Sequence, residues 1–448
     1  MNPLWSVSRA GLGLSFAWGL TVPCAGWANP LDAFGFGPRG VAMGGAVTAT
    51  ARDVSATYYN PAGLALGDAL LLEVGYTRVE PALTLNGVEQ DVDASAGLQG
   101  GLVLPGVVAG RRVGVGLGVH LPDRRVTRLR ALRQSKPRFE LYDNRPQRLS
   151  ITSGLGIEVA PGLSLGAALT YLSGTEGALR VGGVVHASDP ERTRLLSGMD
   201  VNLKAVRYPS FGLQWCPTRA VCLGVSERER FELALDLDVD VQGRIVSGAD
   251  DSVVVERGRF FLNSRNADLF SPRQVAVAAA WTGANHTLEA DLTWLQWSAF
   301  PGSTATIIID LDLGDLDFTV PLPDPPGPAR YHDIWVPRLG AERRVLGRVG
   351  EDSLWVRGGM FYEPSPAPEQ RGLGNSLDAD KWGASAGLAV EWVDPWGLTP
   401  RPIELALSGL WIGLVERSHL KASPADGVGD VVSGGALVGG SAHVQLAF

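Results

Sequence analysis

The chain has 448 residues, of which 57 are glycine and 19% are charged, and this composition favours one large all-β body over several soluble domains. The formal net charge of −8 argues against nucleic acid as a partner, because phosphate binding requires a basic face. The sequence has no run of about 18 to 20 consecutive apolar residues, so any membrane-spanning segment is expected to be a strand rather than a helix.

Residues 1–28 are predicted to be a secretory signal peptide. Arg9 precedes an apolar run at 10–22, Pro23 breaks that run, and Ala28 is a small residue after which a signal peptidase can cleave. The mature chain is therefore expected to begin at residue 29, on the far side of the inner membrane.

The sequence contains three cysteines, and Cys24 would leave with the signal peptide. Cys216 and Cys222 would then remain as an even pair on either side of a short turn, in a compartment where disulfides persist. A disulfide between them is predicted, and two unpaired buried thiols are the alternative.

The segment at 33–66 is too rich in glycine and alanine for an amphipathic helix and too interrupted for a strand. It holds Gly35, Gly37 and Gly40 in the spacing of a dinucleotide-binding turn, but no strand precedes it and Pro38 lies inside it. No nucleotide cofactor is therefore expected. The glycines instead allow a compact segment to turn where β-carbons would not fit.

Most of the remaining chain alternates between apolar and small or polar residues, which is the period of a β-strand. In the clearest example, Val113, Val115 and Leu117 alternate with glycines. The region at 221–242 fits this period least well. The predicted strands lie near 70–79, 94–104, 111–121, 148–159, 163–173, 199–214, 221–242, 271–282, 286–299, 332–345, 353–363, 380–393, 402–414 and 433–448.

The connections between these strands alternate between short and long. This pattern is typical of an outer-membrane barrel, which has tight periplasmic turns, long outer loops and an even number of antiparallel strands. Closure also removes unpaired strand edges, which lipid does not tolerate. Tryptophans near the predicted strand ends are expected at the lipid headgroups, with core packing as the alternative. They are Trp294, Trp297, Trp335, Trp355, Trp382, Trp392 and Trp411.

Two GxSxG strings are centred on Ser164 and Ser385. A nucleophile elbow needs a sharp turn from a strand into a helix, whereas one serine opens a predicted strand and the other lies within one. The six histidines lack the spacing of metal ligands. No catalytic residue and no metal site are predicted, although calcium binding by Asp236, Asp238 and Asp240 is an alternative to acids that face water.

Residues 124–138 are strongly basic, with six arginines and one lysine. Val126, Leu129 and Leu132 recur at intervals of three among them, which predicts a short amphipathic helix. Two other roles are open for this loop. Its arginines could pair with lipopolysaccharide phosphates, or its charged face could simply be solvated.

The glycine-rich segment ends in YYNPAG at 58–63, and its pattern of small residues resembles the periplasmic hatch of the FadL/TodX family. This family comprises outer-membrane channels for long-chain fatty acids and other hydrophobic compounds. Residues 271–300 are similar to the family's central hairpin, and 335–381 are similar to the strands that follow it. The chain ends on Phe448, an aromatic terminus that is common in outer-membrane proteins.

The resemblance implies an all-β fold, a transmembrane antiparallel β-barrel of about fourteen strands at 70–448, with an N-terminal hatch at 29–69 inside its lumen. It implies passive transport of fatty acids or similar hydrophobic compounds across the outer membrane of a Gram-negative bacterium, without a cofactor. The expected partners are a hydrophobic ligand, membrane lipid and lipopolysaccharide. It also assigns Val126, Leu129 and Leu132 to an apolar groove that captures the ligand.

Strand parity predicts which charged residues line the lumen. These residues alternate with apolar ones that must face lipid, where a charge would cost about 2 to 4 kcal/mol at the bilayer midplane. The predicted lumen residues are Glu289, Asp291, Arg357, Glu391 and Glu404.

The hatch is predicted to border an apolar ligand pocket and to release the ligand when it shifts. The residues expected at this pocket are Phe34, Phe36, Tyr58, Tyr59, Asn60 and Pro61. Asn60 would also fix the chain where the hatch joins the first strand, because the residue before a proline is held extended.

Two other functions are compatible with the sequence. The barrel could anchor a partner protein without transporting anything, or it could hydrolyse acyl chains through Ser164 or Ser385. A stoichiometric protein partner in a pull-down would favour the first function. Phospholipid hydrolysis that is lost when either serine is replaced would favour the second.

Overall fold

A computed structural model gives the fold, and it describes residues 30–124, 137, 139, 142, 148–186, 194–246, 253–301, 304–311, 330–348, 351–371, 377–393, 401–420 and 429–448. Four short helices come first: α1 (Pro30–Phe34), α2 (Pro38–Ala42), α3 (Ala56–Tyr59) and the 3-10 helix η2 (Pro61–Leu66). A further 3-10 turn, η4 (Trp297–Ala299), follows a later strand. The predicted signal peptide at 1–28 lies outside the described residues.

Strands make up most of the described chain. They are β1 (Leu71–Leu85), β2 (Val88–Glu89), β3 (Ser95–Val108), β4 (Arg111–Pro122), β5 (Ser150–Ala160), β6 (Leu163–His186), β7 (Arg194–Trp215), β8 (Val221–Arg228), β9 (Phe231–Val246), β10 (Val253–Ser271), β11 (Gln274–Thr282), β12 (His286–Leu295), β13 (Thr304–Leu311), β14 (Ile334–Leu346), β15 (Ser353–Glu363), β16 (Lys381–Trp392), β17 (Ile403–His419) and β18 (Val431–Ala447).

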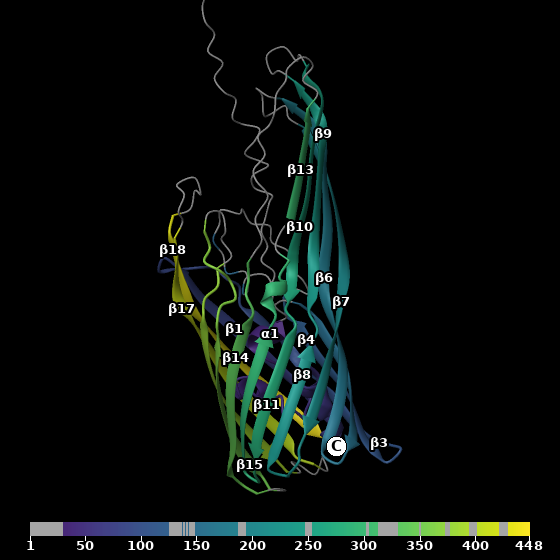
Figure 1. Ribbon diagram of the computed structural model, residues 1–448, viewed down its shortest axis with the longest axis vertical. Helices are drawn as coiled ribbons and strands as arrows, with labels where there is room; N and C mark the ends of the chain where they lie inside the picture. Colours follow the sequence, from purple (N-terminus) through teal and green to yellow (C-terminus); the bar gives the residue numbers. More distant parts are fainter. Residues whose placement is uncertain are drawn as a thin grey trace, which may run out of the picture.

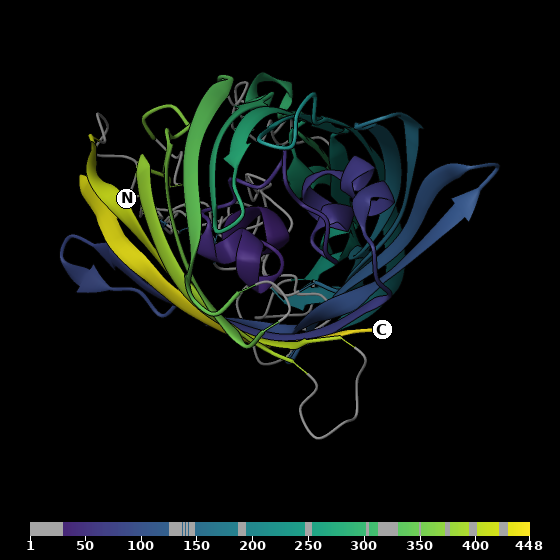
Figure 2. The same cartoon turned by 90° about the horizontal axis from the view of Figure 1, so that it is seen from below.

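The strands close into a barrel (Figures 1 and 2). Its ring runs through β1, β3 to β8, β11, β12 and β14 to β18, with each strand antiparallel to the next. The first and last strands complete it, in register from Leu71↔Ala447 to Leu85↔Ser433. The predicted all-β barrel of fourteen antiparallel strands is thereby confirmed. Such closure leaves no strand edge exposed to lipid.

Five strands rise above one side of the ring (Figure 1). The hairpin of β6 and β7 is longer than the barrel requires, and β9 pairs in parallel with β6 from Leu179↔Val239 to His186↔Val246. β10 pairs with β9 and β13 pairs with β10, both antiparallel. These pairings form a sheet that continues from the barrel wall, and we call it the extension.

The extension corrects three sequence expectations. The single strand expected at 221–242 is divided, because β8 pairs within the ring only as far as Arg228↔Gln274 and β9 then pairs with extension strands. Residues 243–270, expected to connect two strands, contain β10, which pairs with β9 and β13. The short β13 likewise lies in a region expected to be a loop.

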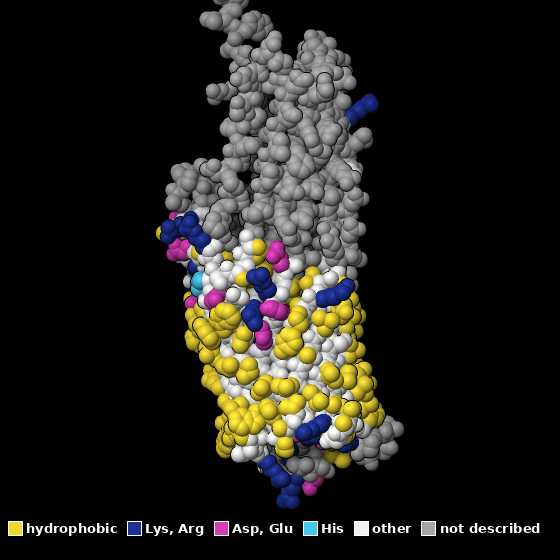
Figure 3. All heavy atoms as spheres, turned by 45° about the vertical axis from the view of Figure 1, so that its right-hand side comes forward, with side chains coloured by type: hydrophobic (Ala, Val, Ile, Leu, Met, Phe, Trp, Pro, Cys, Tyr) yellow, Lys and Arg dark blue, Asp and Glu magenta, His cyan; other side chains and the backbone are white. Residues whose placement is uncertain are grey.

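The ring strands carry many exposed apolar side chains, which form a broad hydrophobic band across the face shown in Figure 3. β12 shows the cause: Leu288 and Leu292 are 49% and 39% exposed, whereas Glu289 and Asp291 between them are 3% and 5% exposed. This alternation of apolar outward and polar inward residues is that of a transmembrane barrel. None of the helices in the described part of the chain is long and apolar enough to cross a bilayer.

The tryptophans do not all follow the predicted headgroup placement. Trp335, Trp382, Trp392 and Trp411 are exposed on the outer surface, which a headgroup placement requires. Trp297 is instead buried in η4, where its ring centroid lies 5.6 Å from that of Phe270. Trp297 lies in the turn after β12, not in a strand. The alternation of strand residues therefore does not predict which way its side chain points.

Residues 30–69, the N-terminal segment, lie inside the ring (Figure 2). The helix η2 contacts β4 to β7 on one side of the lumen, and α2 contacts β15 to β17 on another. Glycines in the wall make this close approach possible. A Cβ at Gly166 would lie 2.2 Å from the carbonyl carbon of Pro61, and a Cβ at Gly156 would lie 2.6 Å from Ala65 N.

Candidate ligand site

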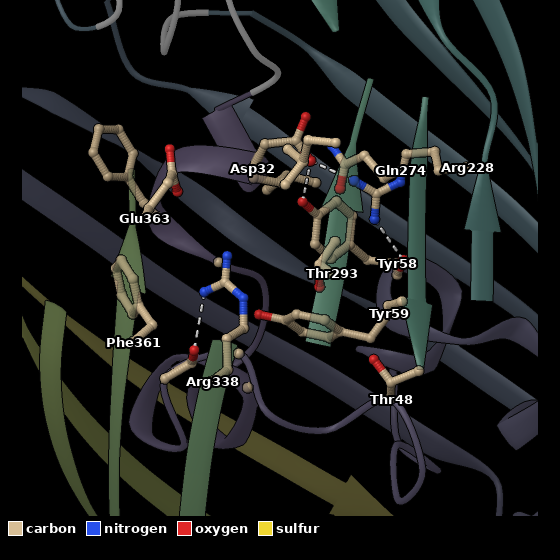
Figure 4. Close-up of a pocket in the computed structure, with 18 of the residues that line it drawn as sticks. Asp32, Thr48, Tyr58, Tyr59, Arg228, Gln274, Thr293, Arg338, Phe361 and Glu363 are labelled. Carbon is tan, nitrogen blue, oxygen red and sulfur yellow. Dashed lines mark hydrogen bonds and ion pairs between the residues drawn. The ribbon is translucent and has the colours of Figure 1, made fainter. Parts of the chain in front are cut away.

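A cavity of about 130 Å³ lies between the N-terminal segment and the barrel wall (Figure 4). The N-terminal segment contributes α1, the end of α2 with the turn that follows it, and the end of α3. The wall contributes residues from β7, β8, β11, β12 and β14 to β17. A cavity of about 150 Å³ with an apolar lining is large enough to hold benzene. The space is therefore suited to a small hydrocarbon or to part of a longer chain.

One end of the cavity is apolar. Phe34 and Val41 of the N-terminal segment meet Phe361, Leu410 and Ile412 of the wall, and all five belong to one buried hydrophobic cluster. The alternation of β17 places Leu410 and Ile412 inward, since the residues between them face outward. This end can accept an apolar ligand without desolvating a polar group.

A hydrogen-bonded group of three residues forms a second part of the lining. Asp32 of α1 pairs with Arg228 of β8 and accepts a hydrogen bond from the Tyr58 hydroxyl. The Arg228 Nη2 also donates to the Tyr58 carbonyl oxygen at 2.8 Å, and its guanidinium lies 4.0 Å from the Tyr58 ring centroid. Burial raises the pKa of Tyr58 well above its usual value, so the hydroxyl remains a donor at neutral pH. These contacts tie α1 and α3 to the wall.

Tyr59 and Arg338 lie on the next part of the lining (Figure 4). The Tyr59 hydroxyl oxygen accepts a hydrogen bond from Phe36 N at 3.2 Å, and burial raises the pKa of Tyr59. Arg338 of β14 donates from Nη1 to the Gly44 carbonyl oxygen at 3.1 Å. Its guanidinium carbon is 4.8 Å from the Phe361 ring centroid, within range of a cation–π contact.

The six residues expected at the pocket separate into two groups. Phe34, Tyr58, Tyr59 and Pro61 line the cavity. The cavity lining does not include Phe36 or Asn60. Phe36 is packed in a second hydrophobic cluster, mostly of N-terminal segment residues.

Asn60 has a structural role at the end of α3. Its Nδ2 donates to the carbonyl oxygens of Thr48 at 2.7 Å and of Leu213 in β7 at 3.0 Å, and its Oδ1 accepts from Ala62 N at 3.2 Å. The side chain is fully buried. Asn60 therefore joins the N-terminal segment to the wall and caps η2, rather than bordering the cavity.

The predicted lumen residues face inward, and several hold the N-terminal segment. Glu289 accepts from Ala49 N at 2.6 Å, and Asp291 accepts from Thr48 N at 3.1 Å. Carboxylates that accept backbone N–H groups in this way satisfy donors that the lumen would otherwise leave unpaired. Glu391 accepts a hydrogen bond from the Ser353 hydroxyl at 2.5 Å.

Arg357 and Glu404 belong to a separate charged cavity of about 50 Å³, to which Arg39 of α2 also contributes. Arg357 lies between Glu342 and Glu404, at 3.3 Å and 3.0 Å. Arg39 reaches the same Glu342 at 2.8 Å. Glu342 thus connects the N-terminal segment to the wall. Its parity in β14 indicates that it faces the lumen, but not which residues it contacts there.

Parity could also have revealed Arg338. It follows Trp335 and Pro337 of β14, both exposed, and precedes the exposed Leu339, so it must face the lumen. The resemblance to the family covers this strand but assigns Arg338 no role.

The remaining predicted residues are placed as follows. Cys216 and Cys222 form a disulfide, with their Cα atoms 4.1 Å apart, and they pack against Ala49 of the N-terminal segment.

The Ser385 hydroxyl donates a hydrogen bond to the Ala42 carbonyl oxygen at 2.9 Å, so it holds α2 to the wall. The outer-loop residues Val126, Leu129 and Leu132 lie outside the described residues, as do the side chains of Asp236, Asp238 and Asp240.

Comparison with known proteins supports the fold. No family model matches the chain. Alkane uptake protein A of Marinobacter nauticus is 23% identical over 438 residues, which cover 93% of this chain and 91% of the relative.

Two solved structures resemble this one over most of their length. A FadL homologue of Pseudomonas aeruginosa superposes with a TM-score of 0.58 and 14% identity, over 92% of this chain and 98% of its own. The toluene transporter TodX of Pseudomonas putida superposes with a TM-score of 0.51 and 15% identity, over 92% of this chain and 98% of its own. The protein is therefore a fourteen-stranded barrel with the FadL/TodX fold, and the resemblance of its sequence to this family is confirmed at the level of the fold.

Proposed function

We propose that this protein is a passive channel for hydrophobic compounds in the outer membrane of a Gram-negative bacterium. The observation that carries the proposal is the cavity with an apolar end, enclosed in a barrel whose outer surface is an apolar band. The names of its relatives agree with this function, since one is an alkane uptake protein and another a toluene transporter.

The N-terminal segment acts as the hatch of this channel. It lies across the lumen and contacts the wall on two sides, through η2 and α2 (Figure 2). A ligand in the cavity can reach the periplasm only after part of the segment moves. The turn after α2 is suited to such movement, because Gly44 and Gly45 adopt φ values of +65° and +80° that other residues avoid.

The polarity of the cavity lining suggests the route of the ligand through the channel. A hydrophobic compound enters from the outer side and occupies the apolar end beside Phe34 and Phe361. It is released when the hatch shifts, and its concentration gradient drives the movement. The outer loop with Val126, Leu129 and Leu132 is proposed to make the first contact with the ligand.

Filling the cavity tests this function. Replacing Ile412, which is 3% exposed and lines the cavity, by tryptophan should lower the uptake of radiolabelled toluene or octane severalfold in cells that produce the protein. The matched control is Leu407→Trp on the same strand, because Leu407 is 60% exposed on the outer surface. Uptake that is equal in wild type, Ile412→Trp and cells without the protein would refute a transport function.

A further inference from the structure

Three neighbouring turns at one end of the barrel form a continuous strip. They join β7 to β8, β11 to β12 and β14 to β15, on the side where β1 begins and β18 ends (Figure 1). Thr282 N donates to the Ala220 carbonyl oxygen at 2.8 Å, and Arg344 N donates to the Asn285 carbonyl oxygen at 2.9 Å, so hydrogen bonds connect each turn to the next. Short turns and both barrel termini are typical of the periplasmic end.

The strip carries exposed arginines. Arg219, Arg343 and Arg348 are all exposed, and we call these three residues the basic rim. Arg343 lies on the outward face of β14, as Leu339 does. Across the described part of the chain, no ion pair includes a residue of the basic rim. Their charges are therefore available to a partner outside the protein.

Acids do not balance the basic rim. The described residues of the three turns include two acids, Glu351 and Asp352, both after Arg348. Asp352 is already engaged, since its Oδ1 accepts a hydrogen bond from Val393 N at 2.9 Å. The whole chain has a formal net charge of −8, so this excess of arginine does not follow from the overall composition.

Exposed tryptophans lie between the basic rim and the hydrophobic band. Trp215 ends β7 and Trp281 lies near the end of β11, and they are 44% and 52% exposed on the outer surface. Figure 3 shows basic side chains at the lower edge of the hydrophobic band. Tryptophan rings are enriched at the depth of lipid headgroups. The basic rim, which follows them toward the periplasm, therefore lies at the depth of the lipid phosphates.

A phospholipid fits both parts of this surface. Arginine binds phosphate through parallel hydrogen bonds, and its guanidinium keeps its charge at any physiological pH. The acyl chains would cover the exposed apolar residues of the same strands, such as Val277 of β11 and Leu288 of β12. A headgroup without an ammonium is favoured, because an ammonium would lie beside several guanidinium groups. A soluble acidic protein would use the arginines but not the apolar residues.

We infer that the basic rim and the tryptophans above it bind an anionic phospholipid of the periplasmic leaflet, with its phosphate at Arg219, Arg343 and Arg348. This interaction goes beyond the proposed function, because it uses the outer face of the barrel and not the cavity. It fixes the depth at which this side of the barrel lies in the membrane.

Native mass spectrometry of the full-length protein in detergent micelles tests the inference. The protein is titrated with phosphatidylglycerol and with phosphatidylethanolamine that carry the same acyl chains. Wild type should bind phosphatidylglycerol about fivefold to thirtyfold more tightly, the factor for one or two arginines that each contribute about fivefold near an anionic surface. Added salt should reduce this preference, because the rim is exposed.

Substitutions assign the preference to the basic rim. Together, Arg219→Gln, Arg343→Gln and Arg348→Gln should bring the two affinities to within about twofold, because no rim charge remains. The matched control combines Arg124→Gln, Arg194→Gln and Arg371→Gln, three exposed arginines beyond the opposite ends of the ring strands. It changes the net charge equally and should keep the preference of wild type. Heat-modifiable migration on a gel checks that both variants contain a folded barrel.

Three outcomes would overturn the inference. The first is equal affinity of wild type for the two lipids, which would leave the basic rim to an acidic protein of the periplasm. The second is an unchanged preference in the variant without rim arginines. The third is an equal loss in the control, which would make the effect one of net charge alone. None of these outcomes affects the proposed transport, which the uptake assay with Ile412→Trp tests separately.

Discussion

Single charged residues hold the N-terminal segment to the barrel wall. Glu342 of β14 accepts hydrogen bonds from Arg39 of α2 and from Arg357 of β15, and all three side chains are largely shielded from water. Without the Glu342 carboxylate, two guanidinium groups would face each other in a region of low dielectric. A buried charge that loses its partner destabilises a protein far more than an exposed one.

We expect Glu342→Gln to weaken the attachment of α2 by about 3 kcal/mol, the cost of removing one partner of a buried pair. Hydrogen exchange of the amides at 39–45 would measure this as faster exchange, while the barrel strands keep their protection. Glu369→Gln is the control, because Glu369 and Arg371 form an ion pair whose side chains are 52% and 75% exposed. Unchanged exchange at 39–45 in Glu342→Gln would show that this pair does not hold the segment.

Inward-facing glycines of the barrel strands leave room for the helix η2, a role that the alternation of residues along a strand does not reveal. A Cβ at Gly114 would lie 1.9 Å from the Leu64 carbonyl oxygen, and one at Gly212 would lie 2.0 Å from the Asn60 Oδ1. These glycines come from different strands, β4 and β7, and both contact the region around η2. The inward face of this part of the wall therefore lacks side chains because η2 occupies their place.

Gly166→Ala should displace η2 from the wall and destabilise its packing by about 1 to 3 kcal/mol, the usual cost of overpacking. The new methyl group would meet the backbone of Pro61, which cannot rotate away. Limited proteolysis should cut the variant near 61–66 while its heat-modifiable migration on a gel stays that of a folded barrel. Gly198→Ala on β7 is the control, since a Cβ there meets nothing within 4 Å, and it should resist proteolysis as wild type does. Equal resistance of Gly166→Ala would contradict the close packing of η2.

For the whole molecule, the barrel closes without help from the segment that it contains. The ring is completed by β1 and β18, and each ring strand pairs with its two ring neighbours. Inward acids such as Glu289 and Asp291 would be solvated if water replaced the N-terminal segment. The strands can therefore close into a barrel even when the N-terminal segment does not fill the lumen.

Deletion of residues 33–63 should leave a folded barrel with raised nonspecific conductance, because water and ions would fill the vacated lumen. Single-channel recordings in planar bilayers would detect larger and less selective currents than in wild type. Extraction that still requires detergent, together with a high content of β-structure, would show that the barrel is intact. A folded deletion variant with wild-type conductance would show that the N-terminal segment does not close the lumen.

The inward or outward face of most residues in the ring strands was predictable from the sequence. Leu288, Glu289 and Asp291 illustrate this, because a strand has a side-chain period of two and lipid accepts only the apolar set. The N-terminal segment could likewise be recognised as compact from its glycines. These features depend on residues that are adjacent in the chain, so the sequence by itself determined them.

Features that join distant parts of the chain were decided only by the tertiary structure. The division between β8 and β9, the position of Glu342 between Arg39 and Arg357, and the hydrogen bond from Arg338 to Gly44 all depend on which strands meet around the ring and above it. Periodicity specifies the face of a residue but not its partner across the lumen. The partner is set by strand register and by the position of the N-terminal segment, which arise only when the barrel closes.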